Sequence, residues 1–79
     1  MVFTQKQVDK LKELRRKFKG RAVHGEDGTV ANVDEIYFDM DRESLVVVSE
    51  QRGTLLKLDC SACGKMIAME RLEKLLNES

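Results

Sequence analysis

The amino-acid sequence predicts a single α+β domain over residues 1–79, with an N-terminal amphipathic helix, a small antiparallel β-structure that curls on itself, and a short C-terminal helix. Two observations predict this class. Apolar residues recur at helical spacing near both ends of the chain, and short β-branched runs separated by turn residues fill the middle. Seventy-nine residues allow only one small core, so a metal, a dimer or a partner would add stability that matters.

The first helix is predicted over residues 4–19. Thr4 is a favourable N-cap, and Gln7 stands three residues later, as a capping box requires. One apolar stripe follows at helical spacing and consists of Val8, Leu11, Leu14 and Phe18. Gly20 can adopt the left-handed conformation that ends a helix. These signals agree with one another, so this is the best-defined element of the sequence.

Residues 21–69 are predicted to form the β-structure. The expected strands cover residues 21–24, 29–39, 45–48, 54–59 and, in one of two interpretations, 66–69. A bulge at Asp34 and Glu35 would restore the alternation of strand 29–39 and curve it. The spacing of Val30, Val33 and Ile36 also fits a helix, which leaves that segment open between the two.

The Val-rich run at residues 45–48 is apolar on both faces. A strand of this kind is expected to be covered on both sides, here by the interior of the β-structure and by the first helix.

Residues 66–69 fit a strand or a helix, and the C-terminal helix is predicted over 69–77. Its apolar positions are Met69, Leu72, Leu75 and Leu76.

Residues 19–50 resemble the first half of a PRC-barrel or another small SH3-like β-barrel. The resemblance is carried by a Gly-x-x-Val strand opening at residues 19–23, an aromatic-Asp strand end at 36–39 and the Val-rich strand at 45–48. It implies a five-stranded antiparallel SH3-like barrel at 21–69, and a binding or adaptor module rather than a catalyst. The chain departs from the family in its leading helix and in the Cys-x-x-Cys segment, where such barrels have an ordinary hairpin.

Cys60 and Cys63 form a Cys-x-x-Cys-Gly segment, which is half of a tetrahedral zinc site. His24, Asp59 or the same pair in a second copy of the chain could supply the missing ligands. Two other interpretations stay open. In the first, both residues are ordinary reduced thiols in a turn. In the second, they form a redox pair, although the sequence around them lacks the strand-then-helix pattern of thioredoxin-like proteins.

Charge is distributed unevenly although the formal net charge is zero. Residues 1–21 hold eight bases and two acids, whereas residues 22–50 hold one base and eight acids. The bases of the first segment are Lys6, Lys10, Lys12, Arg15, Arg16, Lys17, Lys19 and Arg21. A basic helix face of this kind could bind a protein partner or contact the phosphates of a nucleic acid, but the acidic body would repel such a backbone.

Four acidic residues match positions 1, 3, 5 and 12 of a calcium loop, namely Asp39, Asp41, Glu43 and Glu50. Ser44 stands where that loop requires Gly, so a solvated acidic hairpin is the favoured interpretation. No nucleophile elbow or phosphate-binding glycine loop is present, and His24 has no nucleophile at a fixed spacing. We therefore expect no catalytic residue.

Together these patterns predict a small, non-enzymatic interaction or adaptor module that binds another protein through its first helix or an open edge of its β-structure. The sequence holds no stretch of membrane-spanning length, and its two cysteines suit the reducing cytoplasm. The first alternative is a nucleic-acid-binding accessory protein that uses the basic helix. The second is a zinc-stabilised homodimer that shares Cys60 and Cys63.

Overall fold

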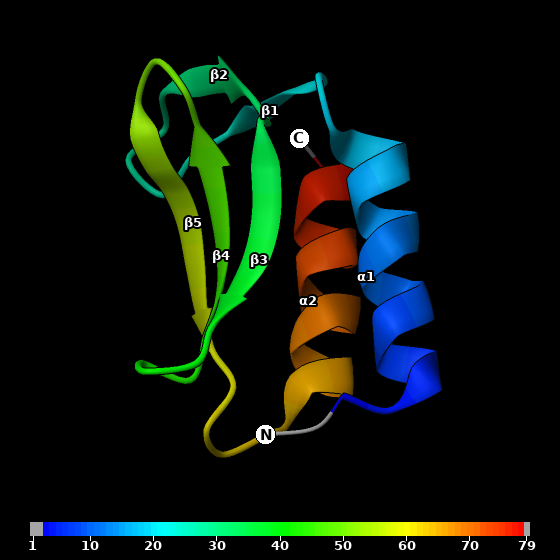
Figure 1. Cartoon of the computed structure of the whole chain (residues 1–79). Coiled ribbons are helices and arrows are strands. Elements are labelled where there is room, and N and C mark those ends of the chain that lie inside the picture. Colours follow the sequence, from blue (N-terminus) through cyan, green and yellow to red (C-terminus); the bar gives the residue numbers. More distant parts are fainter. Residues whose placement is uncertain (1–2, 79) are drawn as a thin grey trace.

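The computed structural model describes residues 3–78 and shows the predicted α+β class (Figure 1). The predicted domain limits at residues 1 and 79 lie outside the described residues. In chain order the elements are α1 (Gln5–Phe18), β1 (Ala22–His24), β2 (Val30–Asn32), β3 (Glu35–Asp39), β4 (Ser44–Ser49), β5 (Gly53–Asp59) and α2 (Lys65–Asn77). No helix among these residues is long and apolar enough to cross a membrane.

Helix α1 begins and ends within one residue of its predicted bounds. The capping box is present, because the backbone N–H of Gln7 donates to the Thr4 hydroxyl at 3.2 Å and the Thr4 N–H donates to the Gln7 side chain at 3.0 Å. Leu14 and Phe18 of the apolar stripe are fully buried. The local signals therefore sufficed to place this helix.

The strands form two small open sheets, β1–β2 and β3–β4–β5, all antiparallel. The single strand predicted over 29–39 is wrong, because the chain changes sheets at its middle. Val33 N–H donates to the Arg21 carbonyl in one sheet, and Asp34 N–H donates to the Val48 carbonyl in the other. The expected bulge at Asp34 is thus a switch between sheets. The observed register shift lies in β5, where Leu55 is the extra residue opposite β4.

No closed barrel is present within residues 3–78, which corrects the prediction for 21–69. The predicted fifth strand at 66–69 is helical, because α2 begins at Lys65. Its apolar side packs into the core and buries Ala68, Met69, Leu72 and Leu76. Since this helix covers the apolar face of the three-stranded sheet, the sheet does not need to close on itself to bury that face.

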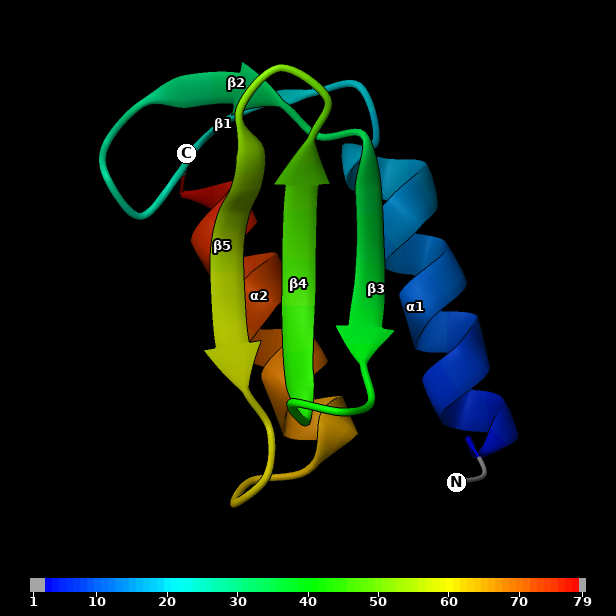
Figure 2. The same cartoon turned by 60° about the vertical axis from the view of Figure 1, so that its left-hand side comes forward.

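Both helices lie on the same face of the three-stranded sheet (Figures 1 and 2). Helix α2 contacts β4 and β5, whereas α1 lies beside β3 and α2. The prediction that the first helix covers residues 45–48 is therefore corrected, since α2 takes this place. Leu45 and Val47 of β4 are fully buried. Val46 alternates to the other face and is still only 4% exposed, between its cross-strand neighbours Tyr37 and Lys57.

Candidate functional site

The two cysteines lie in the loop between β5 and α2, and they occupy different environments. Cys60 is buried, and both its backbone N–H and its thiol donate to the Glu43 carbonyl, at 2.9 and 3.0 Å. Cys63 is half-buried, and its sulfur is 3.7 Å from the carbonyl oxygens of Asp59 and Gly64. Cys60 therefore ties this loop to the β3–β4 turn.

Burial raises the pKa of the Cys60 thiol, which favours the neutral form over the thiolate that binds metals. His24 does not reach the pair, because β1 lies at the opposite end of the molecule from the β5–α2 loop (Figures 1 and 2). Asp59 is adjacent, but its carboxylate accepts the Ser61 N–H at 2.9 Å, and this bond lowers its pKa. Within residues 3–78 no three His, Cys, Asp or Glu side chains gather as metal ligands.

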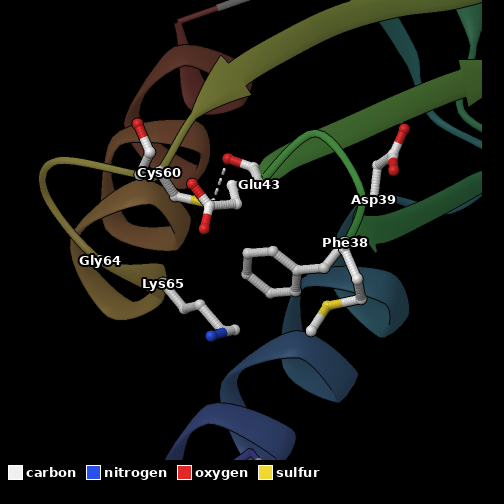
Figure 3. A pocket seen from close by; sticks show the side chains of 8 residues that line it. Phe38, Asp39, Glu43, Cys60, Gly64 and Lys65 are labelled. Atoms are coloured by element: carbon white, nitrogen blue, oxygen red, sulfur yellow. Dashed lines mark hydrogen bonds between the residues drawn. The ribbon is translucent and has the colours of Figure 1, made fainter. Parts of the chain in front are cut away.

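A pocket of about 220 Å³ opens beside Cys60 at the start of α2 (Figure 3). Its lining consists of Phe38, Asp39, Met40, Glu43, Cys60, Ser61, Gly64 and Lys65. Gly64 is the N-cap of α2 with φ of 83°, and it provides no side-chain cap. The lining mixes two carboxylates, one ammonium group and a neutral thiol.

The basic residues of α1 do not form one continuous surface. Lys10 and Lys17 point toward α2, where their ammonium groups lie 2.7 and 3.4 Å from the Glu73 carboxylate. Arg15 turns to the other side, where its Nε is 2.9 Å from Glu35. The remaining predicted contact residues are exposed and comprise Lys6, Lys12, Arg16, Lys19 and Arg21. About half of the predicted basic surface is thus free to contact a polyanion.

The acidic positions of the would-be calcium loop are separated in space. Asp39 ends β3, and its carboxylate accepts the backbone N–H groups of Asp41 and Arg42 at 3.1 and 3.3 Å. Glu50 lies beyond β4, at the opposite end of that strand (Figure 2). Residues 39 and 50 therefore cannot share one ion. The structure agrees with the solvated acidic hairpin.

One edge of the three-stranded sheet, strand β5, is only partly covered. Glu26 covers its first half, because its N–H donates to the Leu55 carbonyl at 2.9 Å and its side chain accepts the Lys57 N–H at 3.3 Å. Further along, Cys60 N–H donates to Glu43 on the β4 side. Backbone groups alternate along an antiparallel strand, so the N–H of Asp59 faces away from β4, where no strand lies.

A groove of about 350 Å³ runs between this part of β5 and helix α2. Its lining consists of Leu58, Arg71, Lys74, Leu75 and Glu78. Leu75 is 42% exposed, although it stands at helical spacing with the buried residues Met69 and Leu72. The sequence analysis missed this groove. The available signal was the placement of Arg71 and Lys74 four and one positions before Leu75, on one side of a helix.

Comparisons of the chain with protein-family models, with curated proteins and with solved structures found no match.

Proposed function

We propose that this protein is a small, non-enzymatic interaction module that binds an extended segment of another protein along the edge of β5. The observation that carries the proposal is the open part of the β5 edge, from the Lys57 carbonyl to the Asp59 N–H, which lies directly beside the groove between β5 and α2. An added strand would gain main-chain hydrogen bonds from the edge, and the groove would select its side chains. The expected absence of a catalytic site fits this role.

The two alternatives have less support from the geometry. A zinc-stabilised homodimer would require the buried thiol of Cys60 to leave the Glu43 carbonyl and lose its proton. A nucleic-acid-binding role would rely on the exposed cations of α1 alone, since Lys10, Arg15 and Lys17 already pair with carboxylates of the same chain.

We also interpret the two sheets as an opened relative of the small SH3-like barrel that residues 19–50 resemble. A backbone hydrogen bond from Glu26 to Leu55 joins the β1–β2 hairpin to the three-stranded sheet. In this interpretation the gap beyond Glu26 is the open part of the barrel wall. It is also the place where a partner strand would be added.

The direct test is selection from a random display library of peptides of about ten residues, the length of a long strand. Selected peptides are then mapped on the protein by amide chemical shifts in NMR. We expect the largest shifts at Lys57–Asp59 and along the facing side of α2. If the selected peptides map elsewhere, or if no peptide is retained, the proposed function is wrong.

Two substitutions at one position separate edge pairing from contact with a side chain. Asp59→Pro removes the outward N–H without removing a bond to β4, so it should abolish binding of the selected peptides. Asp59→Ala removes the carboxylate but keeps the N–H, so it should bind nearly as well as the parent protein. Circular dichroism spectra of both variants report whether the fold is kept. Equal loss of binding in the two variants would argue against strand addition.

A further inference from the structure

We infer that the segment bound at β5 is acidic and apolar: an extended peptide that places one apolar side chain between Leu58 and Leu75 and carboxylates against the cations around them. This inference rests on the proposed function and adds the chemistry of the partner. It follows from the lining of the groove, from cations that pair with no carboxylate within residues 3–78, and from the alternation of side chains along a strand.

The cations at the groove are available to a partner. Lys57, Arg71 and Lys74 are exposed, and none of them makes an ion pair with another described residue. The Arg71 guanidinium lies 4.0 Å from the Cys63 sulfur. This differs from α1, where Lys10 and Lys17 share Glu73. Unpaired cations beside a binding edge attract carboxylates and repel basic segments.

The apolar part of the groove is also incomplete. Leu58 is half-buried against the core, and Leu75 leaves 42% of its surface exposed, directly across the groove. Ile67, earlier on the same helix, is also 46% exposed. One apolar side chain of a partner, inserted between Leu58 and Leu75, would remove this surface from water.

The alternation along a strand fixes where each partner side chain goes. Leu58 is paired with the buried Leu45 and packs against the core, so by strand alternation its neighbours Lys57 and Asp59 lie on the helix-free face of the sheet. A partner residue opposite Leu58 therefore enters the groove. Partner residues two positions away on the same side reach toward Arg71 and Lys74.

A second copy of the chain fits this edge less well. In an antiparallel pairing of two β5 strands centred on Leu58, Lys57 of each copy would meet Asp59 of the other, which is favourable. The same two-fold axis would bring two α2 helices together, each with Arg71 and Lys74 toward the contact. Only Glu78 lines the groove as an acid, so the cations would face like charge. An acidic segment of another protein is therefore the favoured occupant.

The test uses three synthetic peptides of about ten residues, each with a central leucine flanked by valines. The first carries glutamates at both ends, the second carries lysines at the same positions, and the third is the first with consecutive central backbone nitrogens methylated, so that neither of its edges can donate hydrogen bonds as a strand. Binding to the full chain is measured by NMR titration. We expect the acidic peptide to bind at least about tenfold more tightly than the basic one, and the methylated peptide not to bind.

A charge reversal gives a second, independent readout. The double variant Arg71→Glu, Lys74→Glu should exchange the preference and favour the basic peptide, because the carboxylates then stand on the protein. The double variant Lys12→Glu, Arg16→Glu makes the same change in net charge on the exposed side of α1, so it should leave the preference for the acidic peptide unchanged. All four positions are exposed, and the fold should survive in both variants.

The outcomes separate this inference from the proposed function. If display selection yields peptides that map to β5 while the acidic and basic peptides bind equally well, the acidic preference is wrong and edge binding stands. If no peptide of any charge maps to β5, both fail. If sedimentation shows a dimer of the parent protein that Asp59→Pro dissociates and Asp59→Ala does not, a second copy occupies the edge and the inference is overturned.

Discussion

The ammonium group of Lys10 lies 2.7 Å from the carboxylate of Glu73, and this ion pair joins helix α1 to helix α2. Both side chains are only about one fifth exposed, and Lys17 approaches the same carboxylate at 3.4 Å. The hydrogen bond from Lys10 lowers the pKa of Glu73, and the same bond raises the pKa of Lys10. Glu73 therefore neutralises part of the basic face that the sequence suggested for partner binding.

Replacement of Glu73 should weaken the fold in a way that depends on pH. We expect Glu73→Gln to lower the free energy of unfolding at pH 7 by about 1–2 kcal/mol, the range of charge-assisted hydrogen bonds. Because the pKa of Glu73 is lowered in the folded state, its contribution is complete above its ordinary value of 4.5 and is lost as the pH falls through the lowered value. The difference between parent and variant should thus shrink at acidic pH.

Urea unfolding at pH 7 and at acidic pH measures this difference. Glu70→Gln is the matched control on the same helix, since Glu70 is exposed and makes no ion pair among residues 3–78. Glu70→Gln should change the free energy of unfolding only slightly at both pH values. The ion pair would be shown not to stabilise the fold if Glu73→Gln changed the free energy of unfolding by the same amount at neutral pH and at about pH 2, which is well below the ordinary carboxyl range.

Truncation of two leucines of α2, three residues apart, should destabilise the fold to very different extents. Leu72 is fully buried, so Leu72→Ala should cost about 2–5 kcal/mol, which is comparable to the whole stability expected of a domain of this size. Leu75 is 42% exposed, so Leu75→Ala should cost less than about 1 kcal/mol. Thermal unfolding followed by circular dichroism distinguishes them.

The same pair of variants separates stability from binding. Leu75→Ala should keep the fold and weaken binding of the acidic peptide. Leu72→Met preserves the volume of the core and should keep both the fold and the binding. A fully folded Leu72→Ala variant of unchanged stability would contradict the position of α2 on the sheet.

Elements defined by contacts between residues close in sequence could be predicted, whereas elements defined by contacts distant in sequence could not. The capping box of Thr4 and Gln7 is local, and the sequence placed α1 within one residue. The start of α2 at Lys65 was missed because Met66 and Ile67 fit a strand or a helix equally well. The helix is decided by packing of Ala68 and Met69 against the core, a contact distant in sequence. The switch between sheets at Val33 and Asp34 likewise depends on partners far along the chain.

The candidate site was harder to predict than the fold for the same reason. Leu75 and Leu76 are adjacent and equally apolar, and only the tertiary structure shows that Leu76 is buried while Leu75 lines a groove. The sequence drew attention to the basic helix, yet it could not reveal that Glu73, 63 residues after Lys10, would occupy part of it. The open edge of the β-structure was anticipated in general terms. Its position on β5 depends on where Glu26 covers that strand.

The two cysteines should differ strongly in reactivity. Cys60 is 8% exposed and its pKa is raised by burial, whereas Cys63 is half-buried beside Arg71. We expect iodoacetamide to modify Cys63 at least about tenfold faster than Cys60 in the folded protein, and both at similar rates in denaturant. Mass spectrometry of digested samples measures each rate.

Zinc added before the reagent tests the shared-metal alternative in the same experiment. If the pair binds zinc, both thiols should become protected and native mass spectra should show metal shared between two chains. We expect neither result. Equal rates for Cys60 and Cys63 without zinc would contradict the buried environment of Cys60.

The other edge of the three-stranded sheet, β3, is protected by a side chain of α1. Arg15 Nε donates to the Ile36 carbonyl at 2.8 Å and lies 2.9 Å from the Glu35 carboxylate. Exposed edge strands promote pairing between molecules, and a charged group on the edge prevents it.

Arg15→Met keeps most of the apolar stem but removes the donor, so we expect a loss of about 1 kcal/mol in stability and concentration-dependent self-association. Arg16→Met, at the exposed neighbouring position, should change neither property. Sedimentation velocity over a range of concentrations measures the association, and identical behaviour of the two variants would show that Arg15 does not guard this edge.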